Sequence, residues 1–247
     1  MKLCDLMAKF ESWCPVATAM DFDNVGLLVG DPDMEIAKAA VALDATIESI
    51  AFAKKAGANL LVTHHPIIFR PLKSLTPDKV TWHAMQAGVA VVSMHTNLDV
   101  AQGGVNDCLA GALQLTDVQN LCDDGLGRVG NLPAAMDDAQ LAAFVKQQLG
   151  ANGVRYNKTG RIHTRVAVGG GACGDLWGEA LATGATALIS GEAKYNDFLD
   201  AAQNGICIAA AGHFATEQVV CGALYQFVKE QGIDCDLCAQ TDVEEFC

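Results

Sequence analysis

The sequence predicts an α/β fold built from two similar modules. Apolar runs typical of buried strands alternate with amphipathic stretches typical of helices, the pattern of βαβ units in parallel sheets. Residues 54–63 are also similar to residues 181–190, and each segment is followed by a helix, a glycine, a buried strand and a His-x-x-x-acid sequence. Chance is the alternative, because helix–Gly–Ala–strand is common in α/β proteins. The repeated histidine favours an internal duplication, with modules over residues 1–125 and 126–247.

Length and composition restrict the class of protein. A chain of 247 residues with 51% hydrophobic residues is large enough to bury one or two cores. Its net charge of −13 argues against a nucleic-acid-binding role, which needs a basic surface. The first residues, Met1 to Glu11, carry charges at short intervals and do not form a signal peptide. We therefore expect a cytoplasmic protein with reduced thiols and no membrane span.

Helices and strands are expected to alternate along the first module. Charged residues in the last turn and a following glycine favour a helix over residues 45–56 between two parallel strands. A loop with three prolines covers residues 66–80. The predicted helices are residues 3–13, 45–56, 80–87 and 105–115, and the predicted strands are residues 38–44, 60–63 and 89–93.

The second module repeats this order. Residues 120–133 are rich in Gly and Asp and mark either a domain boundary or a hairpin. The predicted helices are residues 137–149, 176–182, 194–203 and a long one over 216–230, and the predicted strands are residues 166–168, 187–190 and 206–210.

Four of the six histidines follow predicted strands directly. His64 and His65 end the strand over residues 60–63, while His95 and His213 follow two others. Open α/β sheets bind ligands at the carboxyl ends of their strands. A carboxylate follows four residues after His95 and after His213, namely Asp99 and Glu217. One helical turn would bring each pair together, which predicts a site for two metal ions.

The types of these residues restrict the metal. Imidazole nitrogen combined with carboxylate oxygen suits Zn, Fe, Mn, Co or Ni and does not select among them. No paired cysteines flank the histidines, so a thiolate-rich structural zinc site is not expected. The simpler interpretation of any one histidine, such as His83 or His163, is a surface or core residue.

Three further patterns have a functional and a simpler interpretation. The cluster Arg155, Lys158, Arg161 and Arg165 either binds substrate or contacts another subunit. The glycine run over residues 169–174 either binds phosphate through its amides or forms a tight turn. Cys235 and Cys238 form a C-x-x-C without a second pair, and we interpret them as ordinary thiols.

The chain as a whole resembles the Nif three-like family, also known as dinuclear-metal-centre proteins and GTP cyclohydrolase I type 2 homologues. The similarity lies in the sequences at residues 23–30, 62–66, 95–99, 191–192 and 212–217. It implies two α/β modules with the metal site between them, and a ring-shaped homohexamer. It also implies the metal ligands His64, His65, Asp99, His213 and Glu217, with Glu217 bridging, while His95 supports the site or transfers protons.

We therefore expect a dinuclear metal-dependent hydrolase with two divalent ions per chain and a small-molecule substrate. In the GTP cyclohydrolase-like reaction, water activated by the metals attacks C8 of guanine, the ring opens and formate leaves. His95 or Glu192 would move the proton. Two alternatives are a metal-dependent phosphoester hydrolase and a non-enzymatic metal-binding or regulatory protein that acts through protein partners.

Overall fold

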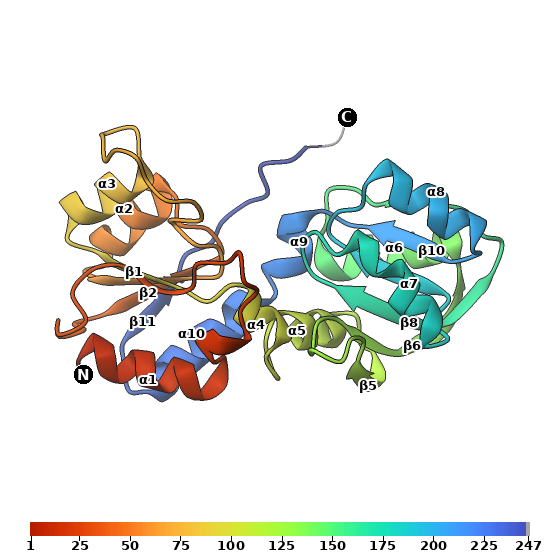
Figure 1. Ribbon diagram of the computed structural model, residues 1–247, viewed down its shortest axis with the longest axis horizontal. Coiled ribbons are helices and arrows are strands. Elements are labelled where there is room, and N and C mark those ends of the chain that lie inside the picture. Colours follow the sequence, from red (N-terminus) through yellow and green to blue (C-terminus); the bar gives the residue numbers. More distant parts are fainter. Residues whose placement is uncertain (246–247) are drawn as a thin grey trace. The chain divides into compact units, whose positions relative to one another are not determined.

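The computed structural model describes residues 1–245 (Figure 1). Their strands form two sheets, and helices pack against both. Contacts divide the chain into two compact units. The first unit combines Met1–Gln102 with Val220–Thr241, and the second contains Gly103–Val219 and the segment from Asp242 onward. The α/β class predicted from the sequence is confirmed. The division near residue 125 was inferred from the sequence repeat and stays a prediction.

The first unit contains a five-stranded sheet in the order β1-β4-β3-β2-β11. The strands β2, β3, β4 and β11 are parallel, while β1 at the edge runs antiparallel to β4. All residues of the three central parallel strands are buried, as expected for a sheet covered on both faces. The strands are β1 (Gly26–Val29), β2 (Ala39–Ala42), β3 (Leu60–Thr63), β4 (Ala90–Ser93) and β11 (Cys235–Leu237).

Helices cover both faces of this sheet. Helices α2 (Ile47–Lys55) and α3 (Val80–Ala87) lie on one face, and α1 (Leu3–Trp13) and α10 (Val220–Glu230) lie on the other (Figure 1). Helices α1 and α10 pack through aromatic rings, with Trp13 stacked on Phe227 at a centroid distance of 4.6 Å and Phe10 tilted against Phe227 at 4.7 Å. The short helices η1 (Val16–Thr18) and α4 (Thr96–Val100) complete the unit.

The second unit contains a six-stranded sheet in the order β5-β6-β8-β9-β10-β7. Its central strands β8, β9 and β10 are parallel and in chain order, as are β2, β3 and β4 in the first unit. The hairpin expected near residues 120–133 exists, because β5 and β6 pair antiparallel. The strands are β5 (Thr116–Asn120), β6 (Arg128–Asp137), β7 (Arg155–Tyr156), β8 (Ile162–Gly169), β9 (Ala187–Ser190) and β10 (Cys207–Ala210).

Alternate residues of the central strands build two cores in the second unit. Val166 and Val168 face the helices α5 (Val105–Ala112) and α6 (Asp138–Leu149). Ala167 faces the opposite way, toward α7 (Trp177–Ala182) and α8 (Tyr195–Gln203). This alternation is the period of two expected of a strand. The remaining elements are η2 (Gly174–Leu176) and α9 (His213–Glu217).

The prediction of one long helix over residues 216–230 is wrong in its first part. Helix α9 ends at Glu217, a turn follows at residues 218–219, and α10 begins at Val220. The two helices belong to different units, since α9 contacts α5 while α10 contacts β2 and β11. Both helices bury one face, so the apolar periodicity continues through the break. The sequence pattern therefore does not reveal where the first helix ends.

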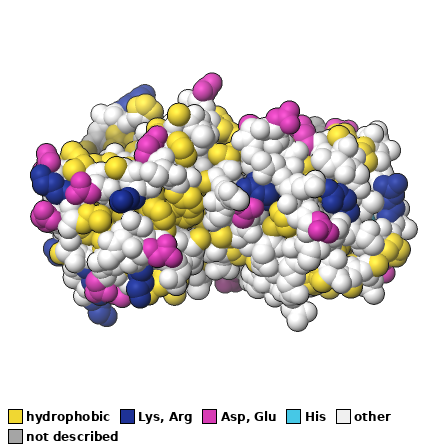
Figure 2. Space-filling view, turned by 90° about the horizontal axis from the view of Figure 1, so that it is seen from below, with side chains coloured by type: hydrophobic (Ala, Val, Ile, Leu, Met, Phe, Trp, Pro, Cys, Tyr) yellow, Lys and Arg dark blue, Asp and Glu magenta, His cyan; other side chains and the backbone are white. Residues whose placement is uncertain are grey.

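Charged side chains of both signs are visible on one face of the protein. Lys and Arg side chains are interspersed with acidic ones on the face seen in Figure 2, without a continuous basic stripe in that view. Within residues 1–245, none of the helices combines the length and the apolar character that a bilayer crossing requires.

The C-x-x-C begins in β11 and does not open a helix. Burial raises the pKa of the Cys235 thiol to about 12.

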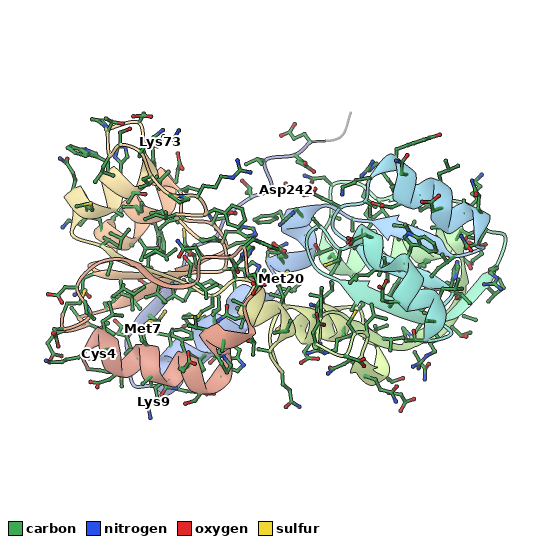
Figure 3. The ribbon with its side chains drawn as sticks, in the orientation of Figure 1. Cys4, Met7, Lys9, Met20, Lys73 and Asp242 are labelled. Atoms are coloured by element: carbon green, nitrogen blue, oxygen red, sulfur yellow. The ribbon has the colours of Figure 1, made fainter. Side chains whose placement is uncertain are left out.

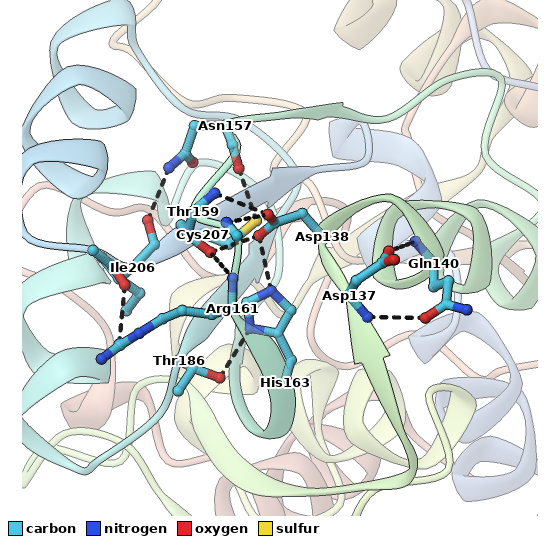
Figure 4. A network of polar contacts seen from close by, with 12 residues as sticks. Asp137, Asp138, Gln140, Asn157, Thr159, Arg161, His163, Thr186, Ile206 and Cys207 are labelled. Atoms are coloured by element: carbon cyan, nitrogen blue, oxygen red, sulfur yellow. Dashed lines mark hydrogen bonds and ion pairs between the residues drawn. The ribbon is translucent and has the colours of Figure 1, made fainter.

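A buried polar network joins α6 to β8, β9 and β10 (Figure 4). Asp138 accepts hydrogen bonds from Thr159, from the Gly160 amide and from Nε2 of His163, while the other ring nitrogen, Nδ1, contacts Thr186 Oγ1 at 2.9 Å. Cys207 lies near enough for a shared metal. Because the protein already uses both carboxylate oxygens of Asp138, we interpret the network as structural.

We predict that Asp138→Asn destabilises the protein at neutral pH by about 2 kcal/mol. Burial would raise the pKa of Asp138, but the hydrogen bonds outweigh it and lower the pKa to about 2. This stabilisation is therefore complete above the unfolded pKa of about 4 and is lost as the pH falls toward 2, with roughly half remaining at pH 3. Urea unfolding at neutral pH and at pH 3 measures both effects.

Asp137→Asn is the control for this prediction. Asp137 is the N-cap of α6 and accepts from the Gln140 amide, a role that Asn performs about equally well. Its stability should stay close to that of the wild type at both pH values. Equal losses in the two variants would show that the network around Asp138 contributes no specific stabilisation.

Candidate functional site

In the first unit, three parallel strands end side by side. Ala42 of β2, Thr63 of β3 and Ser93 of β4 are aligned in the hydrogen-bonding register. A titratable side chain comes two residues after the end of each strand. These residues are Asp44 after β2, His65 after β3 and His95 after β4. The sheet thus brings together groups that are more than twenty residues apart in sequence.

Backbone and hydroxyl contacts hold the turn that contains His64 and His65. The amides of both histidines donate to the Leu43 carbonyl at 3.2 and 3.0 Å. The Thr63 hydroxyl donates to the His65 carbonyl and contacts Ser93 Oγ at 2.9 Å. This turn ends the strand and frees the two imidazoles from the alternation that would place them on opposite faces.

The imidazoles of His64, His65 and His95, hereafter the histidine cluster, lie next to one another. Nitrogen atoms from the three rings all fall within 4.8 Å of each other. The ring centroid of His64 lies 4.9 Å from that of His65 and 5.2 Å from that of His95. Asp99 extends the cluster, with its Oδ1 3.7 Å from Nε2 of His64.

Each histidine of the cluster is oriented through Nδ1. The Met94 carbonyl lies 2.9 Å from Nδ1 of His64, Asp44 Oδ1 lies 2.7 Å from that of His65, and Asp23 Oδ1 lies 2.8 Å from that of His95. Such partners fix the tautomer of a metal-binding histidine and direct the other nitrogen, Nε2, toward the ion. All three rings share this arrangement.

Asp23 belongs to a loop that is fixed against the end of β4. Its carboxylate accepts from the backbone and hydroxyl of Thr96 as well as from His95, and Thr96 Oγ1 accepts from the Met20 amide, whose residue is labelled in Figure 3. Burial would raise the pKa of Asp23, but these hydrogen bonds outweigh it and hold the pKa far below its usual range. Asp23 is therefore ionised at neutral pH and holds the His95 ring in place.

In the second unit the same construction recurs. Gly169 of β8, Ser190 of β9 and Ala210 of β10 are aligned in register. Two residues after the first two strands come Gly171 and Glu192, and the Glu192 amide donates to the Gly171 carbonyl at 2.8 Å. The third strand leads through Gly212 into α9, which begins at His213.

His213 contacts a carboxylate on each side, and we call His213 with Glu217 the His213 pair. Nδ1 of His213 lies 2.6 Å from Glu192 Oε1, while Nε2 lies 3.0 Å from Glu217 Oε2. The spacing of four on α9 therefore brings the pair together, as the sequence predicted. Glu217 is buried, and Glu192 is half exposed.

The glycines after β8 make room for the His213 pair. A Cβ atom at Gly171 would lie 2.2 Å from Glu217 Oε1 and 3.2 Å from Nε2 of His213. Gly171 also has φ +62, in the region that favours glycine. A residue with a side chain at this position would displace the carboxylate.

Three amides of this glycine run donate hydrogen bonds within the protein. The Gly170 amide donates to Asn106, the Gly171 amide to Thr216, and the Cys173 amide to Ser190. These bonds agree with the tight-turn interpretation of residues 169–174, and phosphate binding by this run stays a prediction. Gly171 contributes space for Glu217.

The basic cluster of the sequence divides in the structure. Arg161 donates to the Gly205 carbonyl and Arg165 to Asn131. Arg155 lies over the Phe198 ring and, with Lys194 and Glu192, lines a cavity of about 380 Å³. One arginine of the cluster therefore lies near Glu192, and this cavity also contains acidic residues.

Each unit, taken by itself, presents donor atoms of the kinds that bind divalent metals. The histidine cluster offers Nε2 nitrogens, and Asp99 lies beside it, while the His213 pair offers one further nitrogen and a buried carboxylate. All four histidines have an oxygen partner at Nδ1. The core histidine His163 also has an oxygen at Nδ1, so the grouping of three imidazoles in the histidine cluster is the feature that distinguishes the candidate site.

Comparison with known proteins agrees with the α/β fold described above. A family model described as Duf34/NIF3 (NGG1p interacting factor 3) matches residues 1–242. The chain belongs to the Duf34/NIF3 family. A Lactococcus lactis relative named GTP cyclohydrolase 1 type 2 homolog is 38% identical over 224 residues, covering 87% of this chain and 86% of the relative.

Two solved structures share the whole fold of this chain. The crystal structure of Staphylococcus aureus hypothetical protein SA1388 has a TM-score of 0.92 at 26% identity and covers 100% of this chain and 99% of its own. A Bacillus cereus protein related to NIF3 has a TM-score of 0.91 at 23% identity, with the same coverage. The latter likeness concerns the fold alone.

Sequence reasoning found the histidines but missed two of the groups that orient them. Asp44 and Asp23 hold His65 and His95, and neither was predicted to act on a histidine. Asp44 could have been found, because it ends a strand parallel to the one before His65. Asp99 was expected beside His95, whereas its ion-pair distance of 3.7 Å is to His64.

We predict that Gly171→Ala lowers metal content while the protein stays folded, because the new Cβ would displace Glu217. Gly184→Ala is the matched control. Gly184 has φ +78, and nothing lies within 4 Å of its Cβ position, so it has a similar backbone cost without the collision. Elemental analysis after metal loading compares the two variants. Equal metal content would contradict the role of Gly171.

We also predict that Asp44→Ala weakens metal binding by about 10- to 100-fold, the usual effect of removing a group that orients a ligand histidine. The cause is loss of the 2.7 Å contact to Nδ1 of His65. Asp78→Ala removes an exposed carboxylate of the same unit and should leave affinity unchanged. Competition titration with a zinc-binding dye measures both variants, and equal affinities would refute this role of Asp44.

Proposed function

We propose that this Duf34/NIF3 protein is a hydrolase that uses two divalent metal ions per chain. The residues proposed to hold the metals are His64, His65, Asp99, His213 and Glu217. The donor set suits Zn, Fe, Mn, Co or Ni. We further propose that the protein acts in the cytoplasm as a homo-oligomer, with a hexamer as the form implied by the family.

The grouping of three imidazoles in one cluster, together with the shared orientation of the four, carries this proposal. Each has Nδ1 within 2.9 Å of a protein oxygen, from Met94, Asp44, Asp23 or Glu192. The acceptors come from different strands and loops, so four separate parts of the chain are devoted to directing Nε2. Nitrogen and carboxylate ligands with such partners are typical of catalytic metal sites.

Two bound ions would supply Lewis-acid activation of water at neutral pH. The protein's own residues would then move the proton. His95 is held by Asp23 through Nδ1, which leaves Nε2 as the nitrogen that would accept a proton. Glu192 is half exposed beside His213 and is the second proposed proton carrier.

The proposed reaction is hydrolysis of the guanine ring of GTP at C8, which opens the ring and releases formate. Its support is the Lactococcus lactis relative, which is named GTP cyclohydrolase 1 type 2 homolog. The second candidate is phosphoester hydrolysis, which two-metal sites also perform. Arg155 and Lys194 at the cavity beside Glu192 favour it, since both can contact phosphate oxygens.

Metal content provides the first test. We predict about two metal ions per wild-type chain after loading, and a sharp decrease in Glu217→Ala and Glu217→Gln. Glu48→Ala, which removes an exposed carboxylate of α2, is the control and should retain full content. Elemental analysis with Zn, Mn and Fe measures this. Near-zero content in the wild type after each loading would end the catalytic proposal and favour a role through protein partners.

The reaction is tested on the same preparations. Metal-loaded wild type incubated with GTP should release formate and a ring-opened product, and the Glu217 variants should not. Release of phosphate without formate would instead support phosphoester hydrolysis. A metal-loaded protein that attacks neither bond would refute both proposed activities, while the metal site itself would stand on its measured content.

A further inference from the structure

Two phenylalanine side chains are exposed beside the histidine cluster. Phe22 is 64% exposed and Phe69 is 44% exposed, although large aromatic residues are usually buried. Their ring centroids lie 6.2 Å apart with an angle of 70° between planes. The two residues come from different loops, one before β1 and one after β3, so their pairing is a tertiary feature.

This aromatic pair is continuous with the candidate site. The Phe69 centroid lies 6.1 Å from that of His95, edge to face at 88°. The His95 ring in turn lies 5.6 Å from that of His65. An unbroken series of rings therefore leads from the exposed phenylalanines to the histidine cluster within the first unit.

The loops that carry the two phenylalanines are held in place by hydrogen bonds. The Asn24 side chain donates to the Ile68 carbonyl, which joins the loop of Phe22 to that of Phe69. Asp23, the residue after Phe22, is bound to His95 and Thr96. These contacts fix the backbone on both sides of the pair, so the exposed rings are presented by an ordered support.

We propose that Phe22 and Phe69 form an aromatic platform that binds the planar heteroaromatic ring of the substrate. The assignment deepens the proposed function, on which it rests, and identifies the substrate class as a compound with a flat, unsaturated ring. Because the two phenyl rings meet at 70°, one can stack on the face of the substrate ring while the other meets its edge, and both arrangements are favourable. Stacking tolerates different ring systems. The platform would place the ring next to His95, the proposed proton acceptor.

Ligand-observed NMR tests the platform directly. The zinc-loaded protein is used because zinc is diamagnetic, with guanosine, GTP and adenosine as probes. Stacking on phenyl rings should shift the purine protons upfield, and the double variant Phe22→Ala/Phe69→Ala should abolish the shift. Phe22→Tyr/Phe69→Tyr should retain it. Met85→Ala, which removes a 58% exposed apolar side chain of α3, is the control.

Calorimetry on the same variants separates ring binding from anion binding. GTP should bind about tenfold or more weakly to the double alanine variant, as expected for loss of a stacking contact. Inorganic triphosphate, which has no ring, should bind equally to both proteins. Equal losses for GTP and triphosphate would overturn the proposal.

Other outcomes would also overturn it. If none of the purines shifts upfield with the wild type, or if the Ala and Tyr variants behave alike, the phenylalanines do not bind a ring. If sedimentation shows that the double alanine variant loses its assembly while the purine shifts persist, the pair is a contact between subunits. Metal content, measured in parallel, should stay at the wild-type value. Failure of the platform alone would therefore be distinguished from failure of the metal site.

Discussion

The alignment of parallel strands is the constraint on which the rest of the structure depends. In the first unit β2, β3 and β4 end in register, and in the second unit β8, β9 and β10 do the same. A turn after each strand then places one residue at the same edge of the sheet as its neighbours. A shift of one strand by a residue would turn its side chains to the other face and scatter the group. Burial of alternate residues, such as Val166 and Ala167, in two separate cores holds the register.

Given this frame, the histidines are oriented by oxygen atoms from outside their own turns. His65 depends on Asp44 at the end of β2, and His95 depends on Asp23 in the loop before β1. A histidine without such a partner can rotate or change tautomer, which weakens its binding to a metal. The negative charge of the chain is also consistent with this site. Carboxylates near the imidazoles attract divalent ions, and a bound ion would reverse the local charge that would otherwise repel an anionic substrate.

Local sequence signals predicted most of the fold. The helix over residues 3–13 and the strand over residues 60–63 are found as predicted, since each has clear periodicity and a clear end. The histidines at strand ends were visible for the same reason. Contacts that depend on packing were not visible in the sequence. The break between α9 and α10 arises because the two segments pack in different units, and the amides of Gly170 and Gly171 are used by Asn106 and Thr216, which lie far away in sequence. No sequence window contains both partners of such a contact.

The two units use the same construction with different side chains, and packing explains the difference. Asp44 and His65 follow β2 and β3, whereas Gly171 and Glu192 follow β8 and β9. A carboxylate at position 171, matching Asp44, would collide with Glu217, because even a Cβ atom there comes within 2.2 Å of Oε1. The second unit therefore positions its imidazole through Glu192 and takes its buried carboxylate from α9. One arrangement of strands can thus present a histidine-rich set of side chains in one unit and a carboxylate-containing set in the other.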